Sequence, residues 1–594
     1  MGNKIPRPEH PKPQFERKDW QNLNGEWNFA FDDQNQGEKN KWYINKKLPQ
    51  KIIVPFTFET KASGIAERSE HNYVWYQRTF EVSADQDKEV ILNFAAVDYL
   101  TKVWINGNFV GSHRGGYDSF CFEISDFVDY EQENNIVIKV EDSRSKSQPR
   151  GKQTYQQDNF LCWYTRTTGI WQTVWLEFVD QNLYLNDLKI TPDIDRKEVA
   201  LAYNFKAQDF SAGNYSLMTK IKFEGRLINK FELEVKKRNY NIKINLENEN
   251  NEIKLWHPNE PNLYDLEFEL YREDQIVDKI SSYFGMRKIS IKEDKIYLNN
   301  LPIYQKLILD QGYWPETLLT PPSDQAIKKD LELIKEMQFN GVRKHQKIED
   351  DRFYYWADKL GLLVWAEMAS TYQYNDRAVE NFSSQWLRVV RQLYNHPSII
   401  TWVPFNESWG IEDVRQSKKQ QNFTEGIYYL TKSIDSERPV IANDGWEHTI
   451  SDIITFHDYV ESTDKLKKTY LESIDQLLQN KEVFNDQEYI NGGKFIMADN
   501  YHYQGQPIIF SEFGGIAFQE KEGWGYGEQV ESKEELSWRM NQLMKIVKDA
   551  DYFEGYCYTQ LTDVEQEKNG LLDENREFKL ELEKIIEFNQ IVDQ

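Results

Sequence analysis

Two glutamates end apolar, strand-like runs in the second half of the chain: Glu407 in FNESWG (405–410) and Glu512 in FSEFGG (510–515). Two facing carboxyl groups can cleave a glycosidic bond. One, held protonated, gives its proton to the leaving oxygen, and the other, ionised, attacks the anomeric carbon. A separation of about 5–5.5 Å between them would imply retention of configuration. For either glutamate alone, a structural ion pair explains the position equally well.

Further polar residues stand at or near the ends of other apolar runs. Burying such groups in a core costs several kcal/mol each unless they are paired, so a shared functional cleft explains their positions better than a core does. These candidates are Asp310, Arg343, His345, Glu367, Asn406, Asp444, His457, Tyr459 and Asp563.

The elements that must position these residues alternate between apolar runs and amphipathic segments. One such segment, 323–338, begins with Ser323 and Asp324, which predict a capped helix start. Eight strands separated by helices over about 300 residues are typical of a (β/α)8 barrel, whose active site lies at the C-terminal ends of its strands. A doubly wound sheet is the alternative, but no glycine-rich phosphate loop opens any of these helices. The eight predicted strands are 304–310, 341–345, 362–368, 399–407, 439–445, 453–459, 507–514 and 553–563.

The residues before the barrel have the composition of β-sandwiches. Residues 1–180 contain short Val-, Ile-, Phe- and Trp-rich runs, and Asn106-Gly107 predicts a two-residue hairpin turn. Residues 181–285 alternate apolar and charged positions, as in strands with one face in water. We therefore expect a multidomain α and β fold: a jelly-roll sandwich (1–180), an immunoglobulin-like sandwich (181–285) and a C-terminal (β/α)8 TIM barrel (286–594).

The composition argues against several classes of partner. Lys and Arg number 72 against 97 Asp and Glu, and the net charge of −25 disfavours binding to nucleic acid or an anionic membrane. No apolar run approaches the roughly 20 residues that a membrane span needs. No secretory leader is visible at the start, so a cytoplasmic location is expected. The sequence has no HxH or HExxH pattern for a metal hydrolase and gives no sign of an organic cofactor, whereas a loosely bound Na⁺ or Mg²⁺ stays open. Its three cysteines are expected to be buried free thiols.

FNES (405–408) and SEFGG (511–515) resemble the acid/base and nucleophile motifs of glycoside hydrolase family 2. The resemblance covers nearly the whole chain and implies the same three domains in the same order. It also implies a glycoside or oligosaccharide as substrate, and since members often dimerise through sandwich faces, a homo-oligomer stays open. The other motifs that carry it are NLNGEWNF (22–29), VPFTFE (54–59), VWYQRTFEV (74–82), WINGNFVGSHRGGYDSF (104–120), FGMRKI (284–289) and NHPSIITWVPFNES (395–408).

Carried over residue by residue, the resemblance makes Glu407 the general acid/base and Glu512 the nucleophile. Asn406 would hold the sugar 2-hydroxyl, and Arg343 and His345 match positions near the nucleophile. The tyrosine that usually supports the nucleophile is not clearly aligned, because this sequence reads FHDY (456–459), so the role is open between His457 and Tyr459. Further candidates for the sugar pocket are Asp310, Trp365, Asp444, Trp446 and Trp163, of which Trp365 fits a core position equally well.

The resemblance does not choose the sugar. A glucuronidase of this family is expected to carry an Asn-x-Lys pair after the eighth strand, but TDVEQEKNGLL (562–572) has Lys568 followed directly by Asn569. This and the acidic charge favour a neutral sugar, with a β-galactoside expected first. β-Glucuronide, β-mannoside, β-glucosaminide and furanoside specificities stay open, as does, from another class, a non-catalytic carbohydrate-binding protein.

Overall fold

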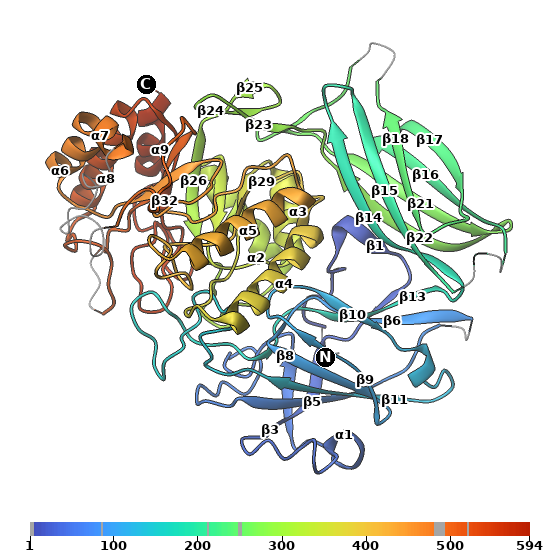
Figure 1. The fold of residues 1–594 in the computed structure, drawn as a ribbon. Helices are drawn as coiled ribbons and strands as arrows, with labels where there is room; N and C mark the ends of the chain where they lie inside the picture. The colour runs from blue at the N-terminus through green and yellow to red at the C-terminus, as the bar shows by residue number, and fades with distance from the viewer. Residues whose placement is uncertain are drawn as a thin grey trace.

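The structure is a computed structural model that describes residues 5–84, 87–208, 210, 213–247, 252–479, 494–518 and 522–593. Two β-sandwiches, blue and green in Figure 1, lie beside a domain of strands and helices that runs from yellow to red. This arrangement confirms the predicted jelly-roll, immunoglobulin-like and TIM-barrel fold class.

The N-terminal sandwich packs two antiparallel sheets around a core that includes Trp27, Phe29 and Tyr76. Asn106 and Gly107 have φ of 50° and 81° and join β8 to β9, which confirms the predicted hairpin. The six-stranded sheet has the order β4 (Gln50–Val54), β3 (Gly25–Phe31), β5 (Tyr73–Phe80), β11 (Asn134–Glu141), β8 (Leu100–Ile105), β9 (Asn108–Arg114). The four-stranded sheet has the order β10 (Phe120–Glu123), β6 (Lys88–Phe94), β13 (Val174–Asp180), β2 (Trp20–Asn22), and β7 (Val97–Asp98) pairs separately with β12 (Gly169–Ile170).

The second sandwich is built from strands that alternate buried and accessible positions. In β16 every second residue from Tyr215 to Ile221 is buried, as a strand with one wet face requires. Its five-stranded sheet has the order β1 (Glu16–Arg17), β22 (Gln275–Phe284), β21 (Tyr264–Arg272), β16 (Tyr215–Phe223), β17 (Arg226–Glu234). Its three-stranded sheet has the order β14 (Leu183–Asp193), β15 (Glu198–Ala207), β18 (Asn239–Asn245). Short strands β23 (Ile289–Lys292), β24 (Lys295–Leu298) and β25 (Leu301–Pro302) lead into the barrel.

The barrel sheet contains seven parallel strands rather than the eight regular strands that the sequence predicts. Segment 439–445 fills the eighth place through isolated bridges, Trp402 to Val440 and Asn406 to Asp444. Side chains replace the missing ladder on its other edge, since Asp452 accepts a hydrogen bond from Val440 N and Ser451 from Ala442 N. The sheet order is β29 (Ile399–Val403), β28 (Leu363–Glu367), β27 (Gly341–Lys344), β26 (Gln305–Asp310), β32 (Phe553–Thr559), β31 (Ile508–Gly514), β30 (Ile454–His457).

Helices pack around this sheet, and the first of them begins where the sequence predicts. Ser323 caps it, with Oγ accepting a hydrogen bond from Ala326 N at 3.1 Å. The polar stretch 475–506 begins inside α7, and its residues 480–493 lie outside the described residues. The helices are α2 (Asp324–Glu336), α3 (Asp351–Leu360), α4 (Asp376–Leu393), α5 (Lys418–Ile434), α6 (Thr463–Lys467), α7 (Ile474–Gln479), α8 (Lys533–Asp549) and α9 (Leu582–Gln590), with α1 (Trp42–Asn45) in the N-terminal sandwich.

Two sequence expectations about exposure have different outcomes. All three cysteines are free, and Cys162 and Cys557 are buried, but Cys121 is exposed, because β10 alternates and turns this residue outward. Within the described part of the chain, no helix is long and apolar enough to cross a membrane.

Candidate active site

Glu407 and Glu512 meet at the C-terminal end of the barrel strands. Glu512 lies within β31, and Glu407 follows the end of β29 by a few residues. A carboxylate oxygen of each and a ring nitrogen of His457 all lie within 4.8 Å of one another. With oxygens this close, the two carboxyl groups can act on the same bond, as in the pairs that act by double displacement, whose carboxyl groups lie roughly 5–5.5 Å apart.

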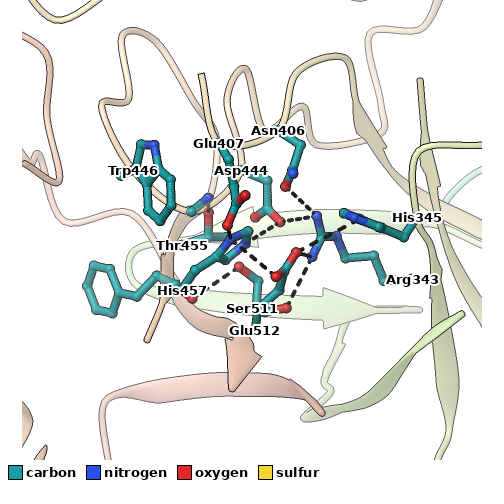
Figure 2. A network of polar contacts seen from close by, with 12 residues as sticks. Arg343, His345, Asn406, Glu407, Asp444, Trp446, Thr455, His457, Ser511 and Glu512 are labelled. Carbon is teal, nitrogen blue, oxygen red and sulfur yellow. Dashed lines mark hydrogen bonds and ion pairs between the residues drawn. The ribbon is translucent and has the colours of Figure 1, made fainter. Parts of the chain in front are cut away.

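Glu512 is held as a carboxylate by donors on either side. Arg343 Nη1 donates to Oε1 at 2.5 Å, and the Tyr459 hydroxyl donates to Oε2 at 2.5 Å (Figure 2 shows the arginine contact). Burial opposes ionisation, but His457 and then Arg343 outweigh it and lower the pKa of Glu512 to about 2. Tyr459 therefore contacts the expected nucleophile directly, whereas His457 Nδ1 lies 3.5 Å from it.

His457 connects Glu407 to a buried aspartate. Its Nδ1 lies 2.9 Å from Glu407 Oε1 and its Nε2 lies 2.9 Å from Asp444 Oδ2 (Figure 2). Burial alone would lower the pKa of this imidazole, but Glu512 and Asp444 raise it to about 10. The ring is therefore an imidazolium at neutral pH and donates a proton at both nitrogens.

Arg343 organises the floor of the site, and its side chain is fully buried. Its Nε lies 2.8 Å from Glu367 Oε2, and its Nη2 lies 2.8 Å from Asp444 Oδ2. Nη2 also donates to Asn406 Oδ1 at 2.7 Å. His345 Nδ1 lies 3.1 Å from Glu367 Oε1. Burial, Lys152 and Arg343 lower the pKa of His345, so this ring is neutral.

The backbone at Glu407 is strained in a way that the neighbouring segment supports. Glu407 and Ser408 have φ of 51° and 59°, a left-handed conformation that non-glycine residues rarely adopt. Glu407 N donates to Asp444 O at 2.9 Å, and Ser408 N donates to Asn443 Oδ1 at 3.0 Å. The irregular eighth segment of the barrel thus fixes the direction of the Glu407 side chain.

Three hydrogen-bond donors at the site, Asn406 Nδ2, Trp446 Nε1 and Trp163 Nε1, have no hydrogen-bond partner among the described residues. Asn406 Oδ1 accepts from Arg343, which leaves Nδ2 as the free donor of that amide. A buried polar group without a partner is costly unless a ligand satisfies it. Sugar hydroxyls are acceptors of the right kind.

A cavity of about 480 Å³ opens over the carboxyl pair. The N-terminal sandwich forms part of its wall, because Trp163 lies between β11 and β12 and packs against Trp409, with ring centroids 5.3 Å apart. The lining residues are Leu161, Cys162, Trp163, Glu407, Ser408, Trp409, Glu412, Trp446, His457, Tyr459, Lys494, Trp524 and Tyr526.

Several residues in or near this cavity were not among those predicted from the sequence. Trp409 directly follows the FNES motif, so its position was a usable signal. Tyr526 stacks on Tyr459 with ring centroids 3.4 Å apart, and Glu567 accepts a hydrogen bond from the Tyr164 hydroxyl at 2.7 Å. Neither of these two follows a recognisable strand end, so only the tertiary contacts identify them.

Two predicted residues lie away from the cavity. Asp310 pairs with Lys344 at 2.7 Å, at the outer side of the sheet where Lys344 also meets Phe353 of α3. Successive strand residues point to opposite faces, so Arg343 points inward and Lys344 outward. Trp365 is fully buried, and its Nε1 donates to Gln305 at the start of β26, the end of the barrel opposite the cavity.

The cluster of Glu407, His457 and Glu512 has the composition of a three-ligand metal site. A metal ion binds only the neutral form of imidazole. With its pKa raised to about 10, His457 keeps the proton that a metal ion would have to displace. The arrangement therefore suits proton transfer and nucleophilic attack better than metal binding.

Sequence comparison assigns three consecutive family models to the chain. Residues 20–178 match the sugar binding domain of glycosyl hydrolases family 2, residues 183–287 match the glycosyl hydrolases family 2 model, and residues 289–537 match that family's TIM barrel domain.

Individual relatives carry two different activity names. A putative beta-glucuronidase of Formosa agariphila is 26% identical over 489 residues, which cover 78% of this chain and 57% of that protein. A beta-galactosidase of Thermoanaerobacter pseudethanolicus is 25% identical over 460 residues, which cover 75% of this chain and 58% of that protein. The matched region thus spans little more than half the length of these relatives.

Solved structures show the same fold. A β-glucuronidase from Ruminococcus gnavus, in complex with N1-substituted uronic isofagomine, superposes with a TM-score of 0.77 at 18% identity, covering 97% of this chain and 98% of that one. The Bacteroides uniformis β-glucuronidase gives a TM-score of 0.77 at 19% identity, covering 97% and 69%.

Proposed function

Because this chain belongs to glycosyl hydrolase family 2, we propose that it hydrolyses terminal β-glycosides with retention of configuration, through a covalent sugar ester on Glu512. The observation that carries the proposal is the carboxyl pair within 4.8 Å, of which Glu512 is held ionised by Arg343 and Tyr459. A non-catalytic sugar-binding protein would have no need of this costly arrangement.

In the first step a Glu512 oxygen forms a bond to the anomeric carbon while the bond from that carbon to the aglycone oxygen breaks. The aglycone oxygen takes a proton from the Glu407–His457 pair, whose Nδ1 and Oε1 lie 2.9 Å apart. In the second step water attacks the same carbon, Glu407 accepts a water proton, and the Glu512 ester is released. Atoms and charge balance with sugar, aglycone and water alone, so the reaction needs no cofactor.

The surrounding residues take positioning roles in this proposal. Asn406 Nδ2, which has no hydrogen-bond partner in the described part of the chain, donates to the sugar 2-hydroxyl. Trp446 Nε1 donates to another hydroxyl, and Trp163 offers a ring face from the N-terminal sandwich. Tyr459 and Arg343 orient Glu512 so that one oxygen stays directed at the anomeric carbon.

We propose that the sugar has the galacto configuration, which the sequence favours. The expected glucuronidase pair is missing here, because Lys568 pairs with Glu574 at 3.5 Å and Asn569 Nδ2 donates to Glu567 at 3.1 Å. Relatives named beta-galactosidase and beta-glucuronidase match about equally well, so they do not decide the substituent at C5 of the ring. That substituent is the subject of the further inference.

The test is hydrolysis of p-nitrophenyl β-glycosides by the wild-type chain, Glu512→Gln and a matched control. We expect Glu512→Gln to lose at least ~10³-fold in kcat with an unchanged melting temperature, since it removes the nucleophile alone. Glu554→Gln replaces a buried glutamate at the far end of β32, where it pairs with Lys295, and should keep the wild-type rate. Proton NMR of the first product should show the β-anomer.

An α-anomer as first product would refute retention. Full turnover by Glu512→Gln would refute its role as nucleophile, and no hydrolysis of any β-glycoside would refute the proposed activity as a whole.

A further inference from the structure

Lys152 places a positive charge from the N-terminal sandwich against residues that line the barrel cavity. Its segment lies between β11 and β12, and only 6% of the residue is exposed. The ammonium lies 4.7 Å from the ring centroid of Trp409 and 5.9 Å from that of Trp163, two residues that line the cavity.

This ammonium has no counterion. Within the described part of the chain Lys152 takes part in no ion pair, and the group that interacts with it most strongly is the thiol of Cys162. The three other buried lysines all have carboxylate partners: Lys139 with Glu38, Lys344 with Asp310 and Glu349, and Lys347 with Glu349. The Lys152 ammonium hydrogen-bonds the neutral thiol of Cys162, so its charge lacks the carboxylate partner that a buried ammonium normally has and is available to an anionic ligand.

Three carboxylates, those of Glu567, Glu512 and Glu407, raise the pKa of Lys152 without forming an ion pair with it. Each of them already accepts hydrogen bonds from other residues. Tyr164 and Asn569 donate to Glu567, Arg343 and Tyr459 to Glu512, and His457 to Glu407. Burial opposes the charge on Lys152, but Cys162 and these glutamates raise its pKa, so the charge persists. Cys162 and Trp409, which the ammonium contacts, both line the cavity, so the ammonium lies next to the space that receives the sugar.

We propose that Lys152 binds a carboxylate on the reacting sugar, which makes the substrate a terminal β-hexuronide. This inference rests on the proposed function, keeps its reaction, and replaces the neutral sugar that the sequence favours. A single ammonium among three acidic side chains suits a monoanion such as a carboxylate; a phosphate ester, which carries close to two negative charges, would meet more repulsion and too few donors.

The cation of this site comes from a different part of the fold than the Asn-x-Lys pair sought in the sequence. Lys568 forms an ion pair with Glu574, and its neighbour Glu567 is an acidic residue that would repel a substrate carboxylate. The absence of that pair therefore removes one cationic position, and Lys152 supplies another from a separate domain.

The experiment compares kcat/KM on the p-nitrophenyl β-D-galacturonide, β-D-glucuronide, β-D-galactoside and β-D-glucoside for four proteins. These are the wild type, Lys152→Met, Lys152→Arg and Lys568→Met, the last a control that removes a cation paired outside the cavity. We expect wild type to prefer a uronide over its neutral counterpart. Lys152→Met should reduce that preference about 100-fold, the usual effect of removing one partner of a buried charge pair. Lys152→Arg should restore part of it, and Lys568→Met should leave it unchanged.

The two uronides separate the galacto from the gluco configuration, and either preference supports the role of Lys152. A wild-type preference for a neutral sugar, or an equal effect of Lys152→Met on neutral and uronic substrates, would overturn the inference while the hydrolase activity stands. If no glycoside is cleaved, the proposed function fails. Calorimetric titration with D-galacturonate and D-glucuronate then decides: binding lost in Lys152→Met supports the anion site, and no binding by wild type refutes it.

Folding does not confound this test. Methionine is one atom shorter than lysine but similar in shape, and it removes a buried charge that has no carboxylate partner, so Lys152→Met should melt at or above the wild-type temperature.

Discussion

At the scale of single residues, the imidazole of His457 lies between the two carboxyl groups and the buried Asp444. It lies 2.9 Å from Glu407, 2.9 Å from Asp444 and 3.5 Å from Glu512. It is also the group that lowers the pKa of Glu512 most strongly, ahead of Arg343 and His345. The nucleophile of a glycosidase must be ionised, and the cation beside Glu512 keeps that carboxyl group ionised.

His457→Asn should lose activity at the acid end of the pH range in which the wild type is active. Without the imidazolium, the pKa of Glu512 rises from about 2 toward its ordinary value of 4.5, so the acid limb of the kcat/KM profile moves to higher pH. His71→Asn, a substitution on the N-terminal sandwich where His71 pairs with Asp33, is the control and should leave the profile unchanged. An acid limb at the same pH in His457→Asn would contradict the assignment.

The same residue has a signature in stability. Its pKa is raised in the folded state from 6.5 to about 10, so its contribution is fully present below pH 6.5 and is lost as the pH rises through 10. The difference in melting temperature between wild type and His457→Asn should therefore be largest below pH 6.5 and should shrink toward pH 10.

At the scale of elements, segment 439–445 does not form a regular strand, and its residues hold the backbone turn at Glu407. Asn443 Oδ1 accepts from Ser408 N at 3.0 Å, and its Nδ2 donates to Ser408 Oγ at 3.0 Å and to Trp446 O at 2.7 Å. Two consecutive left-handed residues cost about 1–3 kcal/mol each and persist only when neighbours hold them.

Asn443→Ala should lower kcat by about 10-fold or more with a smaller change in KM, because a slightly misdirected acid costs rate before it costs binding. Asn340→Ala is a matched control: Asn340 also bonds two backbone groups, Lys306 N and Tyr304 O, but lies near the opposite end of the barrel. It should lower the melting temperature and leave kcat unchanged. Equal kcat effects in both variants would refute a specific role for Asn443.

At the scale of the whole molecule, the N-terminal sandwich completes the site that the barrel begins. Leu161, Cys162 and Trp163 line the cavity, and Glu565 of the barrel fixes their segment. Its carboxylate accepts from Asn159 Nδ2 at 2.9 Å and from both Thr165 N and Oγ1 at 2.6 Å.

Glu565→Ala should therefore raise KM about 5–10-fold with little change in kcat, since a loosened wall weakens binding of the sugar and leaves the carboxyl pair intact. Glu437→Ala, which removes a contact to Arg287 and Ile289 N at the junction with the second sandwich, is the control and should affect stability alone. An unchanged KM in Glu565→Ala would show that the sandwich wall does not contribute to binding.

Much of the fold could be read from the sequence, because the signals are local. Alternation with a period of two identified the sandwich strands, Asn106-Gly107 identified a hairpin, and Ser323 identified a helix start. Polar residues at the ends of apolar runs pointed to Glu407 and Glu512 as a pair, because parallel strands of a barrel end at one face.

The tertiary structure decided what depends on distance between remote segments. In the structure Tyr459 contacts Glu512 and His457 contacts Glu407. His457 and Tyr459 lie only two positions apart in the same predicted strand, so the sequence could not separate their roles. The tertiary structure turned Asp310 and Trp365 away from the cavity, since side-chain direction at a strand end depends on packing. Lys152 lies 255 positions before Glu407 and 360 before Glu512, in another domain, so no local pattern could associate it with the site. The sequence by itself predicted the pair Glu407 and Glu512 and the elements that hold them; only packing between domains placed Lys152 against the cavity lining, because that contact joins segments remote in the sequence.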